Sequence, residues 1–472
     1  MKIPVLWWKR LRIALDSTSP PPEPRLNLWA FSGQRNNPER DACVATLSRL
    51  PGGFLNVTEG FGQGIAYPEY VRLLTDTAIV PSPSGLFTPD CFRTWEALEA
   101  GCLPVVNAQS PRDDRHYPGG YYSWLMDEEV PFPQVDSWEE LPGLVEHYAE
   151  NPLGLLVARN RAGAWWALKK RELQRIGDRI FDVTGQRPPD ASGLRSKVTV
   201  LMPTSPIPSN PSLDVIEKAI DAVRSYPDLS QCEVIVMVDG VRNEQADRRP
   251  AYEEFKRRLI WKCHHEWHGV LPLAFDTHMH QAGMAREALK LVETDFVFYV
   301  EHDTWPCGEI DFEGIVQALA RYAAPKLVRL HHIDRIHPEH EYLMIGDGPE
   351  VYGLGEGDDI RLWPTQQWSQ RPHLASTDYY RWIIDEHFGT TARTMIEDVM
   401  HAVVVNQLRH HKTPWEKFGV CVYIPEGEDI RRSNTADGRG EDPKYPMHYA
   451  YDGHRPVGAP GGAVSHPGEK PR

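Results

Sequence analysis

The 472-residue sequence lacks several features that would place it in familiar classes of protein. It has no run of about 18 apolar residues, so we expect no stable insertion into a membrane. Its seven cysteines are scattered and never spaced Cys-x-x-Cys, which argues against a disulfide framework or a zinc site and favours a reducing, cytoplasmic location. No Gly-x-Gly-x-x-Gly follows a predicted strand, which disfavours a dinucleotide-dependent oxidoreductase.

Basic residues are also fewer than acidic ones. The formal net charge is −15, which gives no overall attraction to nucleic acid or to an anionic membrane, although a local basic groove is compatible with it. Aromatic residues are plentiful, and the 15 tryptophans can fill large cores or stack on flat ligands. A chain of this length exceeds one ordinary core and predicts two or three domains.

Proline-rich breaks divide the chain at 19–24 and at 186–193, and the second separates two halves of similar pattern. The glycine- and proline-rich end of the chain predicts disorder. We therefore expect an N-terminal stub at 1–24, an α/β lobe at 25–186, a linker at 187–196, a second α/β domain at 197–451 and a disordered tail at 452–472.

Apolar strands alternate with helical patterns in both halves, which predicts an α/β fold of two Rossmann-like modules with parallel sheets. The predicted strands are Leu26–Phe31, Ala78–Val80 and Leu103–Val106 in the first half, and Val198–Met202, Glu233–Val238 and Phe296–Val300 in the second. In open sheets of this kind, ligands bind beyond the carboxyl ends of the strands. Asp239, Glu301 and Asp303 follow such ends, which distinguishes them from ordinary surface acids.

The tripeptide Glu301-His302-Asp303 follows the most apolar strand of the second half. Alternation along an extended chain puts the two carboxylates on one side. Such a pair can hold a divalent cation, Mn²⁺ or Mg²⁺, that neutralises a diphosphate. Solvated acids at the start of a loop are the alternative interpretation of this short motif.

The segment 197–311 resembles the nucleotide-sugar half of a GT-A-fold glycosyltransferase of the family-2 kind. The resemblance rests on the opening strand, on Val238-Asp239-Gly240, on Gly283-x-Ala285-Arg286 and on the acidic end of the strand at Phe296–Asp303. It implies a nucleotide-sugar donor bound by Pro203, Thr204, Asp239, Gly283 and Arg286. It also implies a metal ion held first by Asp303 and second by Glu301, since Glu-His-Asp stands here in place of the usual Asp-x-Asp.

The pair Glu397-Asp398 opens a predicted helix that continues to about residue 408. Acids at a helix start often only stabilise the helix dipole, which is the alternative role. The same resemblance places the catalytic base of inverting enzymes at such a pair, where a carboxylate takes the proton of the acceptor hydroxyl. We predict Asp398 as the base, with Glu397 next.

Three further interpretations concern the acceptor and the metal. The loop around Trp368 is rich in aromatic and amide side chains and could form an acceptor wall or be a packed surface loop. The resemblance implies a late histidine as a further metal ligand, for which His448 comes first and His411 second. The acceptor itself stays open between a glycan, a protein, a lipid-linked sugar and a modified nucleobase.

In the first half, a strand, a loop of small residues and a helix run from Ser84 to Val106. A helix N-terminus behind such a loop suits a phosphate, and Arg93 and Glu96 share one helix face. This stretch resembles the nucleotide-binding lobe of exostosin-like GT-B glycosyltransferases over about residues 25–110. Only some 25 residues precede its first strand, where that family has another lobe, so the module could bind a nucleotide sugar without turnover or be structural.

These observations predict a hexosyl- or pentosyltransferase that is inverting and metal-dependent, with catalysis in the domain at 197–451. Two alternatives stay open. One is a sugar- or nucleotide-binding protein with decayed catalysis, and the other is a bifunctional enzyme with a second active site in the exostosin-like half.

Overall fold

The computed structural model describes residues 11–435, except for 13, 17–18, 61–62, 86–87, 110–115, 184–192, 356–357 and 411. The chain divides into two compact units, and each consists of two separate segments. The first unit comprises Met1–Asp190 and Gly240–Asp276, and the second comprises Ala191–Asp239 and Thr277–Arg472. This division differs from the predicted boundaries, because Gly240–Asp276 groups with the first half instead of with its sequence neighbours.

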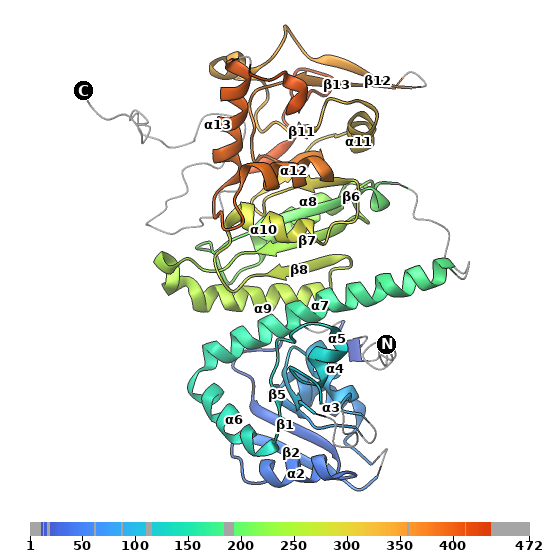
Figure 1. Cartoon of the computed structure of the whole chain (residues 1–472), viewed down its shortest axis with the longest axis vertical. Helices are drawn as coiled ribbons and strands as arrows, with labels where there is room; N and C mark the ends of the chain where they lie inside the picture. The colour runs from blue at the N-terminus through green and yellow to red at the C-terminus, as the bar shows by residue number, and fades with distance from the viewer. Residues whose placement is uncertain are drawn as a thin grey trace, which may run out of the picture. The chain divides into compact units, whose positions relative to one another are not determined.

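The first unit contains a parallel sheet in the order β2-β1-β3-β4-β5, so the α/β prediction is confirmed there (Figure 1). Its strands are β1 (Asn27–Gln34), β2 (Gly53–Thr58), β3 (Thr77–Ser82), β4 (Leu103–Asn107) and β5 (Gln134–Val135), followed in a later segment by β8 (Val270–Ala274). Its helices are α2 (Pro38–Leu47), α3 (Tyr67–Thr75), α4 (Phe92–Glu99), α5 (Tyr121–Met126), α6 (Leu141–Glu150), α7 (Pro152–Val183) and α9 (Arg249–His265). Five large aromatic side chains fill its core: Trp29, Trp95, Tyr122, Trp138 and Trp166.

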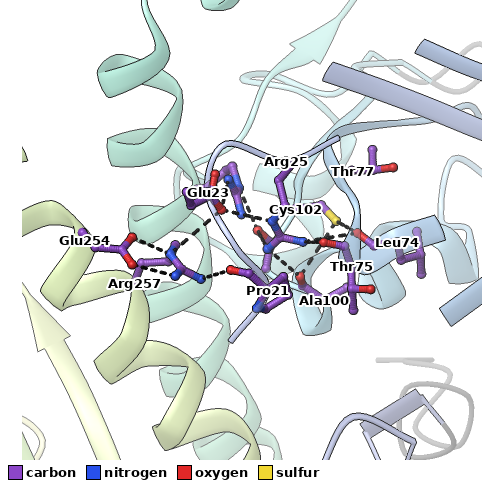
Figure 2. A network of polar contacts seen from close by, with 12 residues as sticks. Pro21, Glu23, Arg25, Leu74, Thr75, Thr77, Ala100, Cys102, Glu254 and Arg257 are labelled. Atoms are coloured by element: carbon purple, nitrogen blue, oxygen red, sulfur yellow. Dashed lines mark hydrogen bonds and ion pairs between the residues drawn. The ribbon is translucent and has the colours of Figure 1, made fainter. Parts of the chain in front are cut away.

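Helix α9 belongs to the first unit because polar side chains fasten it there. Arg257 donates a hydrogen bond to the carbonyl of Pro21 (2.7 Å) and pairs with Glu254 (2.7 Å), as Figure 2 shows. One turn further on, His264 lies 2.9 Å from the carbonyl oxygen of Gly163 in α7. Helices α7 and α9 lie side by side (Figure 1). The segment is therefore an integral part of the first unit.

The second unit contains a mixed sheet in which the strands follow the order β12-β13-β15-β11-β14-β9-β6-β7. Its strands are β6 (Val198–Thr204), β7 (Glu233–Val238), β9 (Phe296–Tyr299), β10 (Thr304–Pro306), β11 (Leu327–Arg329), β12 (Glu350–Gly355), β13 (Asp358–Pro364), β14 (His373–Ser376), β15 (Val420–Tyr423) and β16 (Ser433–Thr435). Its helices are α8 (Asp214–Arg224), α10 (His280–Leu289), α11 (Phe312–Arg321), α12 (Thr377–His387) and α13 (Ile396–Arg409). None of the described helices is long and apolar enough to cross a membrane.

The register of this sheet brings the predicted acids to one edge. Strand β6 runs parallel to both β7 and β9, with Thr204 opposite Val238 and Leu201 opposite Tyr299. All three strands therefore end at the same edge of the sheet. Strand β14 is antiparallel to β9 and begins at this edge, with His373 opposite Tyr299. The chain after β7, the chain after β9 and the loop before β14 thus converge.

Candidate active site

Glu301, His302 and Asp303 form the turn that connects β9 to β10. The amide of His302 donates to the carbonyl of Pro203 (3.2 Å), and the amide of Thr304 donates to the carbonyl of Glu301 (3.0 Å). His302 is buried, whereas Glu301 and Asp303 are half-buried. The turn is thereby anchored to β6, and both acids stand at the edge where the parallel strands end, as the sequence predicts.

A glutamine that the sequence analysis did not single out links Glu301 to helix α13. The side-chain amide of Gln281, on α10, donates a short hydrogen bond to Glu301. The oxygen of the same amide accepts the N–H of Ile396 (3.3 Å), at the start of α13. Because both ends of this side chain are used, it positions the Glu301 carboxylate relative to the helix that carries Glu397 and Asp398.

The pKa of the Glu301 carboxyl is higher than the ordinary value of a glutamate. Burial raises its pKa to about 8, the neighbouring charges of Asp303 and Glu397 act in the same direction, and Arg371 and Gln281 oppose them. Without added positive charge, the site therefore favours the protonated form of Glu301 at neutral pH. A bound cation would reverse this preference and hold the Glu301 carboxylate ionised.

The donor set fits a cation that is shared with a diphosphate. Among the residues that the structure describes, no group of three or more His, Cys, Asp or Glu side chains is placed to hold a metal ion. Mg²⁺ is, however, commonly held by one or two carboxylates plus substrate phosphates. Glu301 and Asp303 can supply the protein's part of such a shell. His448 and His411, the other predicted ligands, lie outside the described residues.

The two acids at the start of α13 have different surroundings. Glu397 is half-buried and accepts the backbone N–H of Gln370 (2.7 Å). Asp398 is exposed on the first turn, and no side chain of the described residues donates a hydrogen bond to it. The structure therefore brings Glu397 toward Glu301 and leaves the carboxylate of Asp398 facing solvent.

Two arginines missed by the sequence analysis accompany these acids. Arg329, on β11, is 1% exposed and donates to the side chain of Gln367 (2.7 Å). Burial lowers its pKa to about 10 although the charge of Glu397 opposes this. Arg371, in the loop before β14, donates a short hydrogen bond to Thr435 of β16. Arg329 could have been singled out from the sequence because it is a charged residue in an otherwise apolar strand, and a buried cation requires a partner.

The positive charges of Arg329 and Arg371 also affect the pKa of His332. Burial lowers its pKa to about 3, and Arg371 and Arg329 contribute to the same shift. The histidine is therefore neutral over the physiological range. Acids and arginines thus stand together at one edge of the sheet, an arrangement suited to an anionic ligand that also carries a cation.

Asp239 follows the end of β7 at the same edge of the sheet. It is 2% exposed, accepts the N–H groups of Met279 (2.6 Å) and His280 (3.1 Å), and lies 2.8 Å from the ring nitrogen of His278. The carboxylate thus holds the chain that leads into α10. The predicted contact with a nucleoside stays a prediction, but the structure shows a positioning role as well.

Other predicted donor-binding residues also have structural partners. Arg286 donates to the carbonyls of Ile384 (2.9 Å) and Phe388 (2.7 Å), which holds the end of α12. A Cβ added at Gly283 would lie 3.3 Å from the Cβ of Met279, so this glycine permits close packing at the start of α10. Thr204 accepts the N–H of Asp239 (3.0 Å) through its carbonyl.

The predicted acceptor wall has a different character in the structure. Trp368 is fully buried, and its ring packs edge-to-face against His373 at 5.4 Å. A fully buried ring offers no open face for a sugar. The packed-loop interpretation therefore describes Trp368 in this structure, because β14 and its neighbours cover the aromatic ring.

In the first unit, Arg93 and Glu96 lie on α4 as predicted. Arg93 donates to the carbonyl of Ser32 (2.7 Å), and its guanidinium lies 4.4 Å from the centre of the Phe31 ring. Its Nε and Nη1 atoms are buried and have no hydrogen-bond partner among the described residues. Glu96 accepts the hydroxyl of Tyr70 (2.7 Å), and burial raises its pKa. Two buried donor atoms of Arg93 thus lack a hydrogen-bond partner among the described residues.

Solved structures with similarity to the chain include TarS of S. aureus, with a TM-score of 0.31, 13% identity and 51% of this chain covered. The mannosyltransferase PcManGT from Pyrobaculum calidifontis, in complex with GDP-Man and Mn²⁺, has a TM-score of 0.27 and 15% identity over 58% of this chain and 68% of that chain. The chain covers 36% of the TarS chain, so it spans about a third of that protein.

No curated protein matches the sequence. One protein family does match, over residues 63–176, and it is described as the RXYLT1 C-terminal domain. The match covers α3 to most of α7 in the first unit and therefore includes the helix that carries Arg93 and Glu96.

Proposed function

We propose that the protein is a glycosyltransferase that moves a sugar from a nucleotide-sugar donor to an acceptor hydroxyl, with its chemistry in the second unit. The observation that carries this proposal is the convergence of Glu301, Asp303 and Glu397 with Arg371 at the carboxyl edge of the parallel strands. The match of residues 63–176 to a glycosyltransferase-related family supports the same class of enzyme.

In this proposal Glu301 and Asp303 hold a divalent cation, Mn²⁺ or Mg²⁺, which when bound neutralises the diphosphate of the donor. Gln281 keeps the Glu301 carboxylate in place through its bond to α13. Arg371 and Arg329 add positive charge beside the acids, where a leaving nucleoside diphosphate gains negative charge. The second unit would thus stabilise the departing group.

We propose Asp398 as the base. The acceptor oxygen forms a bond to the anomeric carbon as the bond from that carbon to the diphosphate oxygen breaks, and the hydroxyl proton passes to the carboxylate. This displacement inverts the anomeric centre. Glu397, the alternative base, already accepts the N–H of Gln370, so one of its oxygens is engaged by the protein. Asp398 has no such restraint among the described residues.

The test is to incubate the protein with a panel of nucleotide sugars and Mn²⁺ or Mg²⁺ and to measure release of nucleoside diphosphate. We expect release from one donor, its loss in EDTA, and its loss in Asp303→Ala. Glu386→Gln is the matched control, because Glu386 is exposed on α12. Absence of turnover with every donor and metal, in a folded protein, would leave only a binding function.

A second candidate function is binding of a nucleotide sugar by the first unit. The two unpaired donor atoms of Arg93 support it, since a phosphate accepts such hydrogen bonds. In an Asp303→Ala background, equilibrium dialysis with a nucleotide sugar should detect binding that Arg93→Met removes. If Arg93→Met leaves that binding unchanged, the first unit has no such site at this helix.

A further inference from the structure

A groove of about 300 Å³ lies in the second unit, away from the acids described above. It is lined by the end of α11, the chain that enters β11 and the first turns of α12. Its position follows from the register of β14, since Ser376 in the groove is opposite Phe296, the first residue of β9, and Glu301 follows the other end of β9. The groove is therefore at the opposite edge of the sheet.

Two of the three aromatic rings that line the groove are held in place by contacts with residues outside it. Tyr322 donates its hydroxyl to the carbonyl of Gly353 (2.8 Å), and its ring packs edge-to-face against Tyr352 at 5.1 Å. Trp382, which is half-buried, packs against Phe418 at 6.0 Å. Rings fixed in this way lose little conformational entropy when a flat ligand packs on them. The volume also falls at the lower end of the range for small-molecule sites.

Polar groups of the groove are available to a ligand. The indole N–H of Trp382 has no acceptor among the described residues. The carboxylate of Asp378 is 95% exposed, and its partner is Arg381 at 3.3 Å. The ammonium of Lys326 makes one long contact, 3.4 Å, with the carbonyl of Lys417. The groove thus offers two donors and an acceptor around the rings of Tyr322, Tyr379 and Trp382.

The charges of the lining restrict what can bind. Asp378 is paired with Arg381, and the ammonium of Lys417 lies 5.8 Å from the centre of the Trp382 ring, so together with Lys326 these charges disfavour a cationic ligand. A neutral ligand with hydroxyl groups and an apolar face satisfies both the rings and the polar groups. A saccharide has this chemistry, because its C–H face packs on aromatic rings and its hydroxyls both donate and accept hydrogen bonds.

We infer that this groove is a binding site for one or two units of a neutral saccharide, separate from the proposed site of sugar transfer. Its position at the far edge of the sheet means that occupancy does not require a donor or a metal ion. The inference therefore does not depend on the proposed transferase activity, and binding can be measured in its absence.

The test begins with an array of immobilised neutral and acidic oligosaccharides, probed with the full-length protein in EDTA. The best-bound neutral oligosaccharide is then titrated and followed by saturation-transfer NMR. We expect Trp382→Ala to weaken this binding by about tenfold or more, the effect of truncating a central aromatic anchor. Asp378→Asn, at a side chain that supports no packing, should weaken it by a smaller factor.

Two control variants separate this site from others. Glu386→Gln changes another exposed acid of α12 and should leave saccharide binding unchanged. Glu301→Gln should also bind normally, even if it abolishes release of nucleoside diphosphate. The inference is overturned if the array shows no bound neutral saccharide or binding of acidic ones alone. It is equally overturned if Trp382→Ala and Asp378→Asn both bind as tightly as the parent protein.

Discussion

Two glutamates, one buried in the first unit and one half-buried in the second, have opposite electrostatic surroundings. Glu99, at the end of α4, is 1% exposed and receives hydrogen bonds from Lys170 (2.9 Å) and Trp166 (2.7 Å). Burial alone would raise its pKa, but the charges of Lys170, His264 and His265 and the hydrogen bond from Lys170 together outweigh this and hold the pKa at about 2. At Glu301, burial and the charge of Asp303 act together and raise the pKa to about 8.

This difference distinguishes an acid with a structural role from an acid that can bind a cation or transfer a proton. Glu99 has a cation and two donors for its oxygens, so it joins α4 to α7 and has nothing left to offer a ligand. Among the described residues, Glu301 has one side-chain donor and stands near other acids. Buried acids whose charge is uncompensated are candidates for binding cations or moving protons. The predictions below test this contrast.

The largest effect is expected at Asp303. In Asp303→Ala, the predicted cation site loses a carboxylate, so we expect sugar transfer to fall by at least about 10³-fold, the upper end for loss of one electrostatic contact. Metal-dependent binding of nucleoside diphosphate, measured by calorimetry with and without EDTA, should fall as well. Thermal unfolding should stay close to that of the parent protein. Full activity in EDTA would contradict the assignment.

Substitution of Asp398 should strongly lower the rate of sugar transfer and leave donor binding unchanged. A general base acts on the acceptor, so Asp398→Asn should bind the donor normally and transfer sugar about 10²–10⁴-fold more slowly. Glu397→Gln should be less impaired, and its loss would be in stability because Gln370 loses a charged acceptor. Normal turnover in a folded Asp398→Asn would transfer the role to Glu397. Stopped assays of nucleoside diphosphate release, with calorimetry of donor binding, distinguish these outcomes.

Glu99→Gln should affect stability and spare the chemistry. Removing the charge of Glu99 takes away the main counter-charge of the buried Lys170, and breaking a buried pair typically costs about 3–5 kcal/mol in free energy of unfolding. Urea denaturation at pH 7 measures this cost. Glu172→Gln, at an exposed pair, is the control and should change stability by less than about 1 kcal/mol. A loss of turnover without a loss of stability would contradict the structural role.

The lowered pKa of Glu99 predicts that the free energy of unfolding depends on pH. Its folded-state pKa of about 2 lies below its ordinary value of 4.5, so its contribution to stability is present above pH 4.5 and is lost as the pH falls toward 2. Glu99→Gln should therefore show a shallower decline of unfolding free energy between pH 4.5 and 2. Parallel declines in the two proteins would show that Glu99 is not the group responsible.

The smallest effect is expected from cutting the chain in the predicted linker at 187–196. Because α9 is packed in the first unit, the two pieces should stay associated after cleavage. Gel filtration after limited proteolysis should show one peak that contains both pieces. Disrupting the contacts of α9 with Arg257→Ala in the cleaved protein should promote separation. Two independent peaks from the cleaved parent protein would contradict this expectation and support the predicted boundary at the linker.

Much of the local structure was predictable because it depends on short-range patterns. Continuous apolar runs predicted β6, β7 and β9, and the strand end at Tyr299 placed Glu301 and Asp303 at the sheet edge. The helix that begins at Ile396 was predicted from its apolar periodicity and its acidic first turn. These features follow from hydrophobic alternation and helix-end chemistry, which neighbouring residues specify by themselves.

The tertiary structure alone decided which distant residues meet. Gln281 reaches Glu301 and Ile396, and Arg329 lies near Glu397, only because β6, β9 and β11 are ordered in one sheet. Packing likewise buried Trp368 and joined Gly240–Asp276 to the first unit. A pattern in sequence specifies which face of an element is apolar, but the partner of that face is selected by the free energy of burying both surfaces together.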